Sequence, residues 1–423
     1  MSAFPARANG ELRAEGVPLS AIAARFGTPC HVYSKAALVE AYRTFDAAFE
    51  GRDRLICYAV KANPNLAILS LFARLGAGFD IVSQGELERV LAAGGVASKT
   101  VFSGVGKSPA EMARALEVGV ACFNVESAAE LDVLAAVARA HGVTAPVSVR
   151  VNPDVDAGTH PYIATGLKSN KFGVPHQEAV ALYRRCAGLG HLEPVGIDCH
   201  IGSQITQVEP FADALDRVLE LVGEIERSGI PLRHLDLGGG VGIRYRDETP
   251  IPIDVYAQAL RSRLDALPYR LVLEPGRSLV GAAGLLLTRV DYLKHGQERS
   301  FAIVDAAMND LMRPALYDAY HPIEVVRDSA ANARSYDVVG PVCESADFLG
   351  RDRELRIAAG DCLAVLCTGA YGSSMGSNYN SRARPAEVMV DGENVHLVRS
   401  REPLERLWEF ESMLPENALP KHL

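Results

Sequence analysis

The sequence predicts two domains, a (β/α)8 TIM-type barrel followed by a mostly antiparallel β domain. Three observations carry this prediction. At 423 residues the chain exceeds what one hydrophobic core usually supports. Short β-rich runs alternate with amphipathic helical segments between about residues 54 and 283. Beyond residue 284 the helical spacing disappears, and alternating strand-length runs separated by Gly/Asp turns replace it.

The first region contains as many β-rich runs as a TIM barrel requires. In order, these runs are RLICYAV, GAGFDIVS, TVFSG, ACFNVES, APVSVRVN, PVGIDCHIG, LRHLDLGGG and YRLVLEPG. Between most of them lie segments with apolar residues at three- and four-residue steps, such as GELERVLAAGG and SAAELDVLAAVARAHG. Several of these segments end on glycine, as helices commonly do. A doubly wound sheet would show the same alternation, but eight units in this length favour a closed barrel.

The remaining residues are expected to form the β domain. Its strand candidates are LLLTRVDYLKHG, RSFAIVDAAM, YDVVGPVCES, RELRIAAGDCLAVLCTGAYG and AEVMVDGENVHLVR. PCHVYSKAALVEAYRTF, near the start, reads as a strand leading into a helix, and this strand could join the β domain. We therefore expect a barrel over 36–283 and a β domain built from 1–35 and 284–423.

Composition excludes several classes of protein. The net charge is −9 with no cluster of Lys or Arg, which argues against a nucleic-acid or anionic-membrane partner. The N-terminus has no signal or transit pattern, and no run approaches a membrane span. Eight cysteines (30, 57, 122, 186, 199, 343, 362 and 367) lie scattered without a C-x-x-C pair. This pattern indicates reduced thiols in the cytoplasm rather than disulfides or a zinc site, and no metal is expected.

Polar residues follow the predicted barrel strands, and the carboxyl ends of those strands carry the active site in this fold. Lys61 ends the first strand, Asp80–Ser83 the second, His200 the sixth, Gly238–Gly240 the seventh and Glu274 the eighth. A lysine that ends an apolar strand is most often simply exposed. At the rim of a barrel, however, an amine at the edge of an apolar pocket is expected to have a lowered pKa and to form a Schiff base.

These residue types suit one cofactor. A glycine run lets backbone N–H groups approach a phosphate closely, and a lysine amine condenses with an aldehyde. Pyridoxal phosphate carries both groups. Glu274 could hold its pyridine nitrogen protonated, which makes the ring an electron sink, and His200 could stack on the ring. In isolation, His200 would more often be an ordinary core histidine.

Two other motifs were weighed. GGGVGI lacks the spacing of a dinucleotide-binding fingerprint. GSSMG, at 372–376, matches the G-x-S-x-G nucleophile elbow, but a polar, proline-ended segment follows it where a helix is required. A serine hydrolase is therefore not expected.

Several motifs together resemble the diaminopimelate decarboxylase family of alanine-racemase-like, fold type III pyridoxal-phosphate enzymes. They are YAVKAN, GFDIVSQGEL, HIGSQ, GGG, EPGR, GPVCESAD and GAYG…NYNSRARPAEV, spread over residues 27–410. THPYIATGLKSNKFG and the CESAD context are the more particular to this family.

The resemblance implies a set of site residues. The cofactor-binding residues would be Lys61, His200, Ser203, Gly240, Glu274, Gly276, Arg277 and Tyr371. The substrate would contact Arg277, Arg313, Tyr317, Glu344 and Tyr371. The catalytic residues would be Lys61 and Cys343, with Cys343 as proton donor. The resemblance further implies a homodimer in which the partner chain supplies Cys343 and Glu344.

Two of these roles depend on the resemblance alone. Arg313 by itself would be a surface charge, and Cys343 a small buried hydrophobe. Two arginines at one rim do suit a substrate with a second carboxylate, since Arg binds carboxylates bidentately. The implied reaction is decarboxylation of meso-2,6-diaminopimelate at its D centre to L-lysine and CO2, the last step of lysine biosynthesis. The alternatives are a decarboxylase of ornithine, lysine or arginine, an amino-acid racemase, and a non-catalytic cofactor-binding homologue.

Overall fold

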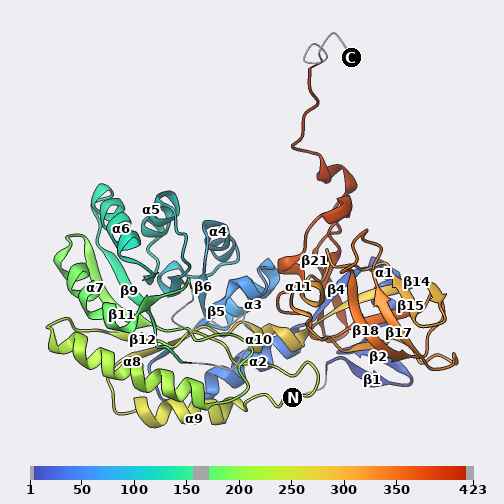
Figure 1. Cartoon of the computed structure of the whole chain (residues 1–423), viewed down its shortest axis with the longest axis horizontal. Coiled ribbons are helices and arrows are strands. Elements are labelled where there is room, and N and C mark those ends of the chain that lie inside the picture. Colours follow the sequence, from blue (N-terminus) through green and yellow to red (C-terminus); the bar gives the residue numbers. More distant parts are fainter. Residues whose placement is uncertain (1–3, 156–170, 416–423) are drawn as a thin grey trace.

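The computed structural model describes residues 4–155 and 171–415. It has two units that lie side by side, a ring of helices around a central sheet and a second body of strands (Figure 1). Most of the THPYIATGLKSNKFG motif lies at 156–170, outside the described residues.

Eight parallel strands close into the predicted barrel. Their bounds are β5 (Arg54–Ala59), β6 (Gly78–Ile81), β7 (Thr100–Phe102), β8 (Cys122–Val125), β9 (Ala145–Asn152), β11 (Leu192–Asp198), β12 (His234–Asp236) and β13 (Arg270–Leu273). The ring closes where β13 pairs with β5, with Val272 opposite Leu55. The two-residue strand β10 (Val174–Pro175) adds to β9 outside the ring.

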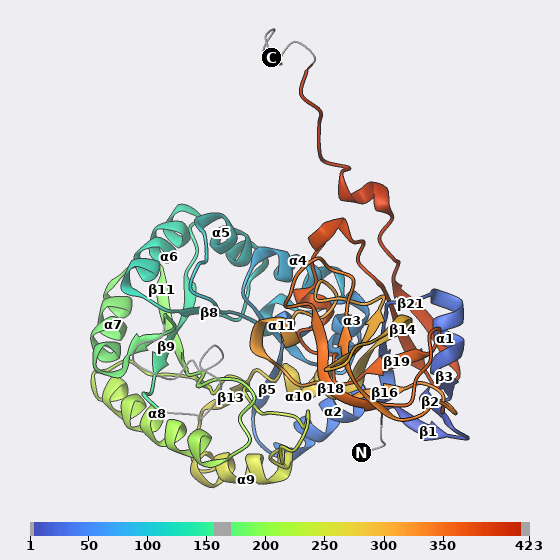
Figure 2. The same cartoon turned by 45° about the vertical axis from the view of Figure 1, so that its right-hand side comes forward.

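Helices connect these strands and cover the barrel, as Figure 2 shows for α5 to α9. They are α3 (Leu66–Arg74), α4 (Gln84–Ala92), α5 (Pro109–Val118), α6 (Ala128–Ala140), α7 (His176–Gly188), α8 (Glu209–Arg227) and α9 (Ile253–Leu264). Their starts follow from local sequence, since Ser83, Ser108 and Ser127 each accept a backbone N–H of the first turn. The Ser108–Glu111 pair forms a full capping box.

The barrel interior changes character from one end to the other. Toward the start of the strands it is filled by small apolar side chains, namely Cys57, Val101, Cys122, Val195 and Val272. Two residues further along their strands, on the same inward face, come Asn124 and Glu274. Asp80, Asp198 and Asp236 are buried at this end as well. The polar end is the one that carries the βα loops.

The second unit is the predicted, mostly antiparallel β domain. Its strands are β14 (Gly284–His295), β15 (Ser300–Val304), β16 (Ile323–Val325), β17 (Arg334–Val339), β18 (Phe348–Leu355), β19 (Cys362–Val365), β20 (Ala386–Asp391) and β21 (Asn394–Arg399). Of its strand pairs, only β15–β17 and β4–β20 run parallel. The expected strand YDVVGPVCES ends at Val339, so CES lies in a loop.

The N-terminal region contributes to this second sheet. β4 (Cys30–Ser34) lies between β14 and β20 and leads directly into α2 (Lys35–Ala48), which packs against α9 and α10 (Arg277–Val280) of the barrel unit. Before β4 come a three-stranded sheet of β1 (Ala6–Ala8), β2 (Glu11–Ala14) and β3 (Val17–Pro18), and the helix α1 (Leu19–Phe26). The last described residues run away from both units (Figure 1).

Candidate active site

Lys61 lies at the rim of the barrel, on the single turn of 3-10 helix Val60–Ala62 that follows β5. Its Nζ donates to Asp80 Oδ2 at 2.5 Å, and Asp80 is fully buried at the end of β6. The lysine side chain is 36% exposed, so its amine stands between the core and the open rim.

The expectation of a lowered pKa for Lys61 is wrong for the chain without cofactor. Burial alone would lower the pKa of this ammonium. The carboxylates of Asp80 and Glu274, with the hydrogen bond to Asp80, outweigh burial and raise the pKa. The sequence argument counted the apolar strand but not the acidic residues on the neighbouring strand ends. To act as a nucleophile, the amine must first pass a proton to this acidic surrounding.

Glu274 follows β13 and belongs to a compact acidic cluster with Asp198 and Asp236. Oxygens of the three buried carboxyl groups lie within 4.8 Å of one another. Burial, followed by repulsion from Asp236, Asp80 and Asp198, raises the pKa of Glu274 well above its ordinary value, and Lys61 opposes this only in part. Burial likewise raises the pKa of Asp236 to about 6. Burial and mutual repulsion therefore favour the protonated forms of these carboxyl groups.

His200 and the glycine run are locked together. His200 Nδ1 accepts the backbone N–H of Gly239 at 3.1 Å, which leaves the ring proton of the neutral imidazole on Nε2. Burial, then the charges of Arg150 and Lys61, lowers the pKa of His200 well below its ordinary value. The ring is therefore neutral and held by the same loop that would bind a phosphate.

The glycines are required by space as well as by backbone conformation. Gly240 has a φ of +112°, and a Cβ there would lie 2.6 Å from the carbonyl oxygen of Gly202. At Gly276, a Cβ would lie 3.1 Å from Cβ of both Ala59 and Ala62. The loops after β11 and β12 are also tied by the bond from Ile205 N–H to Gly240 O, at 2.9 Å. Three loops thus bring their backbones together without side chains between them.

These features fit pyridoxal phosphate. Glu274 Oε1 is buried and has no hydrogen-bond partner among the described residues, so a pyridine N–H would satisfy it. The glycine run has backbone N–H groups that no side chain of its own covers, as phosphate sites require, and Lys61 provides an amine at the same rim.

Arg277 is a buried cation that connects the loop after β11 to the aromatic residues Tyr245 and Tyr371. It is 6% exposed, and its guanidinium donates to Ser203 Oγ at 3.0 Å and to Tyr245 OH at 2.7 Å. The guanidinium carbon also lies 5.0 Å from the ring centre of Tyr371. Its Nε has no hydrogen-bond partner among the described residues.

Arg313 is a second buried cation close to the first. Only 7% exposed, it starts α11 (Arg313–Tyr317) and stacks 4.6 Å from the ring centre of Tyr245. Its Nη1 lies 2.7 Å from His321 Nε2, and burial lowers the pKa of His321 to about 3, so this nitrogen accepts. Burial and the neighbouring Arg277 lower the pKa of Arg313.

Two buried guanidinium groups at one site imply an anionic ligand. Neither Arg277 nor Arg313 forms an ion pair with an Asp or Glu anywhere in the described ranges 4–155 and 171–415. Tyr317 is near enough to influence the pKa of both. A free carboxylate is the group that such a pair binds best.

Tyr371 ties the β domain to the lysine. Its backbone N–H donates to Ala62 O at 2.8 Å, next to Lys61, and its φ is +57°. The predicted rim residues of the barrel and the predicted Arg313, Tyr317 and Tyr371 of the β domain are therefore brought together.

Cys343 and Glu344 are not part of this buried group. Both are exposed in the loop after β17. The Cys343 N–H donates to Asn380 Oδ1 at 2.7 Å. Their exposure in a single chain corrects the reading of Cys343, taken alone, as a buried hydrophobe.

Sequence reasoning missed the residues that hold the others. Asp80 was noticed as a strand end but given no role, and Tyr245, His321 and Asp236 were not singled out. Tyr245 follows the glycine run by five residues, and Asp236 precedes it by two, so both positions carried a signal. His321 gave none, because its contact with Arg313 depends on the path of the chain after α11.

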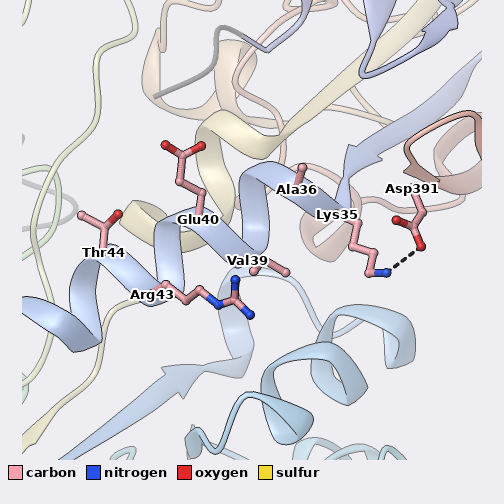
Figure 3. A pocket seen from close by; sticks show the side chains of 7 residues that line it. All are labelled: Lys35, Ala36, Val39, Glu40, Arg43, Thr44 and Asp391. Atoms are coloured by element: carbon pink, nitrogen blue, oxygen red, sulfur yellow. Dashed lines mark hydrogen bonds and ion pairs between the residues drawn. The ribbon is translucent and has the colours of Figure 1, made fainter.

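Two other features are separate from this site. GSSMG forms a 3-10 turn, Ser373–Met375, and not a strand–turn–helix elbow, while Ser373 Oγ contacts Tyr33 and Glu387. A shallow hollow beside α2, lined by Lys35, Val39 and Arg43 among others, contains none of the predicted site residues (Figure 3). Along the described ranges, no helix has the length and apolar character needed to cross a bilayer.

Comparison with known proteins agrees with the site. Residues 35–281 match the family described as pyridoxal-dependent decarboxylase, pyridoxal binding domain. A diaminopimelate decarboxylase of Pseudomonas aeruginosa is 61% identical over 96% of this chain and 98% of its own.

Solved structures give the same result. The diaminopimelate decarboxylase of Helicobacter pylori complexed with L-lysine has a TM-score of 0.90 and 43% identity, covering 95% of this chain and 100% of its own. That of M. jannaschii in co-complex with L-lysine has a TM-score of 0.92 and 38% identity, covering 97% and 98%. The chain belongs to the pyridoxal-dependent decarboxylases and, within them, to the diaminopimelate decarboxylase family.

Proposed function

We propose that this chain decarboxylates meso-2,6-diaminopimelate at its D centre, giving L-lysine and CO2, at a site shared between two copies of the chain. The observation that carries the proposal is the pair of buried guanidinium groups, Arg277 and Arg313, at the rim that holds Lys61. Diaminopimelate has a second carboxylate far from its reacting carbon, and ornithine, lysine and arginine do not.

The chain would hold pyridoxal phosphate with residues from five segments, four of the barrel and one of the β domain. Lys61 would bind its aldehyde, Glu274 its ring nitrogen and His200 its ring face. Ser203, Gly240, Gly276, Arg277 and Tyr371 would surround the phosphate. When bound, this cofactor supplies an electron sink for the electron pair that CO2 leaves behind on the substrate α-carbon.

The protein's own contribution is the placing of charges and protons. The acidic cluster that includes Glu274 favours a proton near the position that a ring nitrogen would take. Asp80 is hydrogen-bonded to Lys61 and holds its amine in place at the rim. Neutral His200 adds no charge beside the ring.

The substrate would be fixed at both ends. Arg277, Arg313 and Tyr317 would bind the distal carboxylate, and burial makes each lost contact costly. Glu344 would bind the distal ammonium and Cys343 would return a proton to the reacting carbon, both from the partner chain. Their exposure supports this assignment, because a second copy could cover them.

Two further assignments accompany the proposal. We place the domain boundaries at 36–283 for the barrel, and at 1–35 with 284–423 for the β domain. We also place the protein in the cytoplasm, where the eight cysteines, all free in the structure, would stay reduced.

The experiment that tests the proposal is CO2 release from a panel of substrates by the holoenzyme. Turnover of meso-diaminopimelate should exceed that of L-lysine, L-ornithine and L-arginine by roughly 10⁴-fold, since those substrates leave buried donors unpaired. Comparable turnover of ornithine or arginine would instead establish a decarboxylase of basic amino acids. Racemised substrate without CO2 would indicate a racemase, and no turnover at all a non-catalytic homologue.

A further inference from the structure

The loop that carries Cys343 is held by backbone hydrogen bonds to two side chains. On one side, buried Asp347 accepts the N–H of Val342 at 2.8 Å and that of Met308 at 2.7 Å. On the other side, Asn380 Oδ1 accepts the N–H of Cys343 itself at 2.7 Å. The backbone around the thiol is therefore fixed by Asp347 within the loop and by Asn380 outside it.

Asn380 is in an unusual backbone conformation. Its φ is +56°, and Ser381 after it also has a positive φ of +54°. Asparagine tolerates this left-handed region better than most residues other than glycine. Its carboxamide oxygen accepts the N–H of Cys343 while its backbone adopts the left-handed conformation. A residue at this position therefore needs both a side-chain acceptor and tolerance of a positive φ.

The segment around Asn380 is anchored at both ends. Ser377 N–H donates to Asn309 O at 2.9 Å, and Arg382 Nη2 donates to Asp305 O at 2.7 Å. Between Asp305 and Asn309, the backbone N–H of Met308 donates to Asp347. The same segment, 305–309, leads into α11, which begins at Arg313. The Cys343 loop and Arg313, the arginine proposed to bind the distal carboxylate, are thus both connected to segment 305–309.

We propose that Asn380 is a positioning residue, which orients the Cys343 loop so that the thiol enters the partner's site. This inference rests on the proposed function, in which Cys343 is the proton donor. It assigns to Asn380 no contact with substrate or cofactor. Its effect would pass only through the Cys343 backbone.

Three variants separate the hydrogen bond from the backbone turn. Asn380→Gly keeps the left-handed turn and removes the acceptor. Asn380→Asp keeps an acceptor at the same place and tolerates the turn. Asn378→Ala is the matched control, because it removes bonds to Arg382 O and Glu402 in the same loop and leaves Cys343 alone.

The holoenzyme variants would be compared by steady-state kinetics and by iodoacetamide labelling of Cys343, quantified by peptide mapping with and without L-lysine. Asn380→Gly should lower kcat about tenfold with a smaller change in KM. It should also reduce the protection of Cys343 by L-lysine, while Asn380→Asp and Asn378→Ala keep both near wild type. Labelling gives a readout independent of turnover.

The outcomes separate this inference from the function beneath it. Full activity of Cys343→Ala would remove the proposed role of Cys343, whatever Asn380 does. An inactive Cys343→Ala together with wild-type kinetics and protection in Asn380→Gly would overturn the positioning role alone. Equal losses in Asn380→Gly and Asn380→Asp would also overturn it, because the acceptor would then not matter.

Discussion

The barrel rim and the Cys343 loop differ in how they hold their functional groups. At the rim, Glu274, Arg277 and Arg313 are buried, and hydrogen bonds to neighbouring side chains hold the two arginines. In the loop, Cys343 and Glu344 are exposed, and backbone N–H groups of the loop donate to the side chains of Asp347 and Asn380. The rim is therefore preorganised within one chain, whereas the exposed loop would gain a dry environment from a second chain in the shared site proposed above.

The largest effect should come from the rim lysine. Lys61→Ala removes the amine that would bind the cofactor, so kcat should fall by a factor on the order of 10³ or more. Borohydride reduction of the wild type followed by peptide mapping should place the pyridoxyl group on Lys61. Lys99→Ala, on the exposed surface, is the control. A pyridoxyl group found on another lysine would refute the assignment.

A smaller loss is expected at the substrate end of the rim. Arg313→Ala leaves a substrate carboxylate without its buried partner, which costs about 2–5 kcal/mol, or roughly 30- to 4,000-fold in kcat/KM. The exposed Arg356→Ala controls for the loss of an arginine from the β domain. If residual turnover of L-lysine fell as much as that of diaminopimelate, Arg313 would not be a carboxylate ligand.

The smallest effect is on the free energy of unfolding, and it results from the buried carboxyl groups that lie close together at the rim. The pKa of Asp236 is raised to about 6 in the folded chain, whereas an unfolded Asp titrates near about 4. Because the folded pKa is the higher one, protonation of Asp236 stabilises the folded chain. This contribution to the free energy of unfolding is fully present below about pH 4 and is lost as the pH rises through about 6.

Asp236→Asn in the cofactor-free protein should therefore melt at a higher temperature than wild type at pH 8. The gain should shrink to nothing near pH 4. The exposed Asp254→Asn should track the wild type throughout. Thermal melts across this range check the sign, and a variant less stable than wild type at pH 8 would contradict it.

The sequence predicted the barrel well because its information is local and periodic. Each strand-to-helix step shows a change from period two to period three or four, and the polar residue at each strand end marks the rim. Val272 and Glu274 illustrate this, since a step of two keeps both on the inner face of β13.

The contacts between the rim residues could not be predicted in the same way. The pairing of Lys61 with Asp80 joins two strands, and the bond between Arg313 and His321 depends on the loop after α11. The raised pKa of Lys61 results from several acids that lie close only in the folded barrel. The exposure of Cys343 likewise depends on where β17 ends, which its apolar run did not mark.

Subunit mixing provides a direct test of the proposed shared site, in which Lys61 comes from one chain and Cys343 from another. Lys61→Ala and Cys343→Ala chains, each inactive alone, would be combined under conditions of subunit exchange. Random exchange makes about half of the dimers hybrids with one intact site in two, so about a quarter of wild-type activity should return. Mixtures that stay inactive, while both variants remain folded and exchange as dimers, would contradict the shared site.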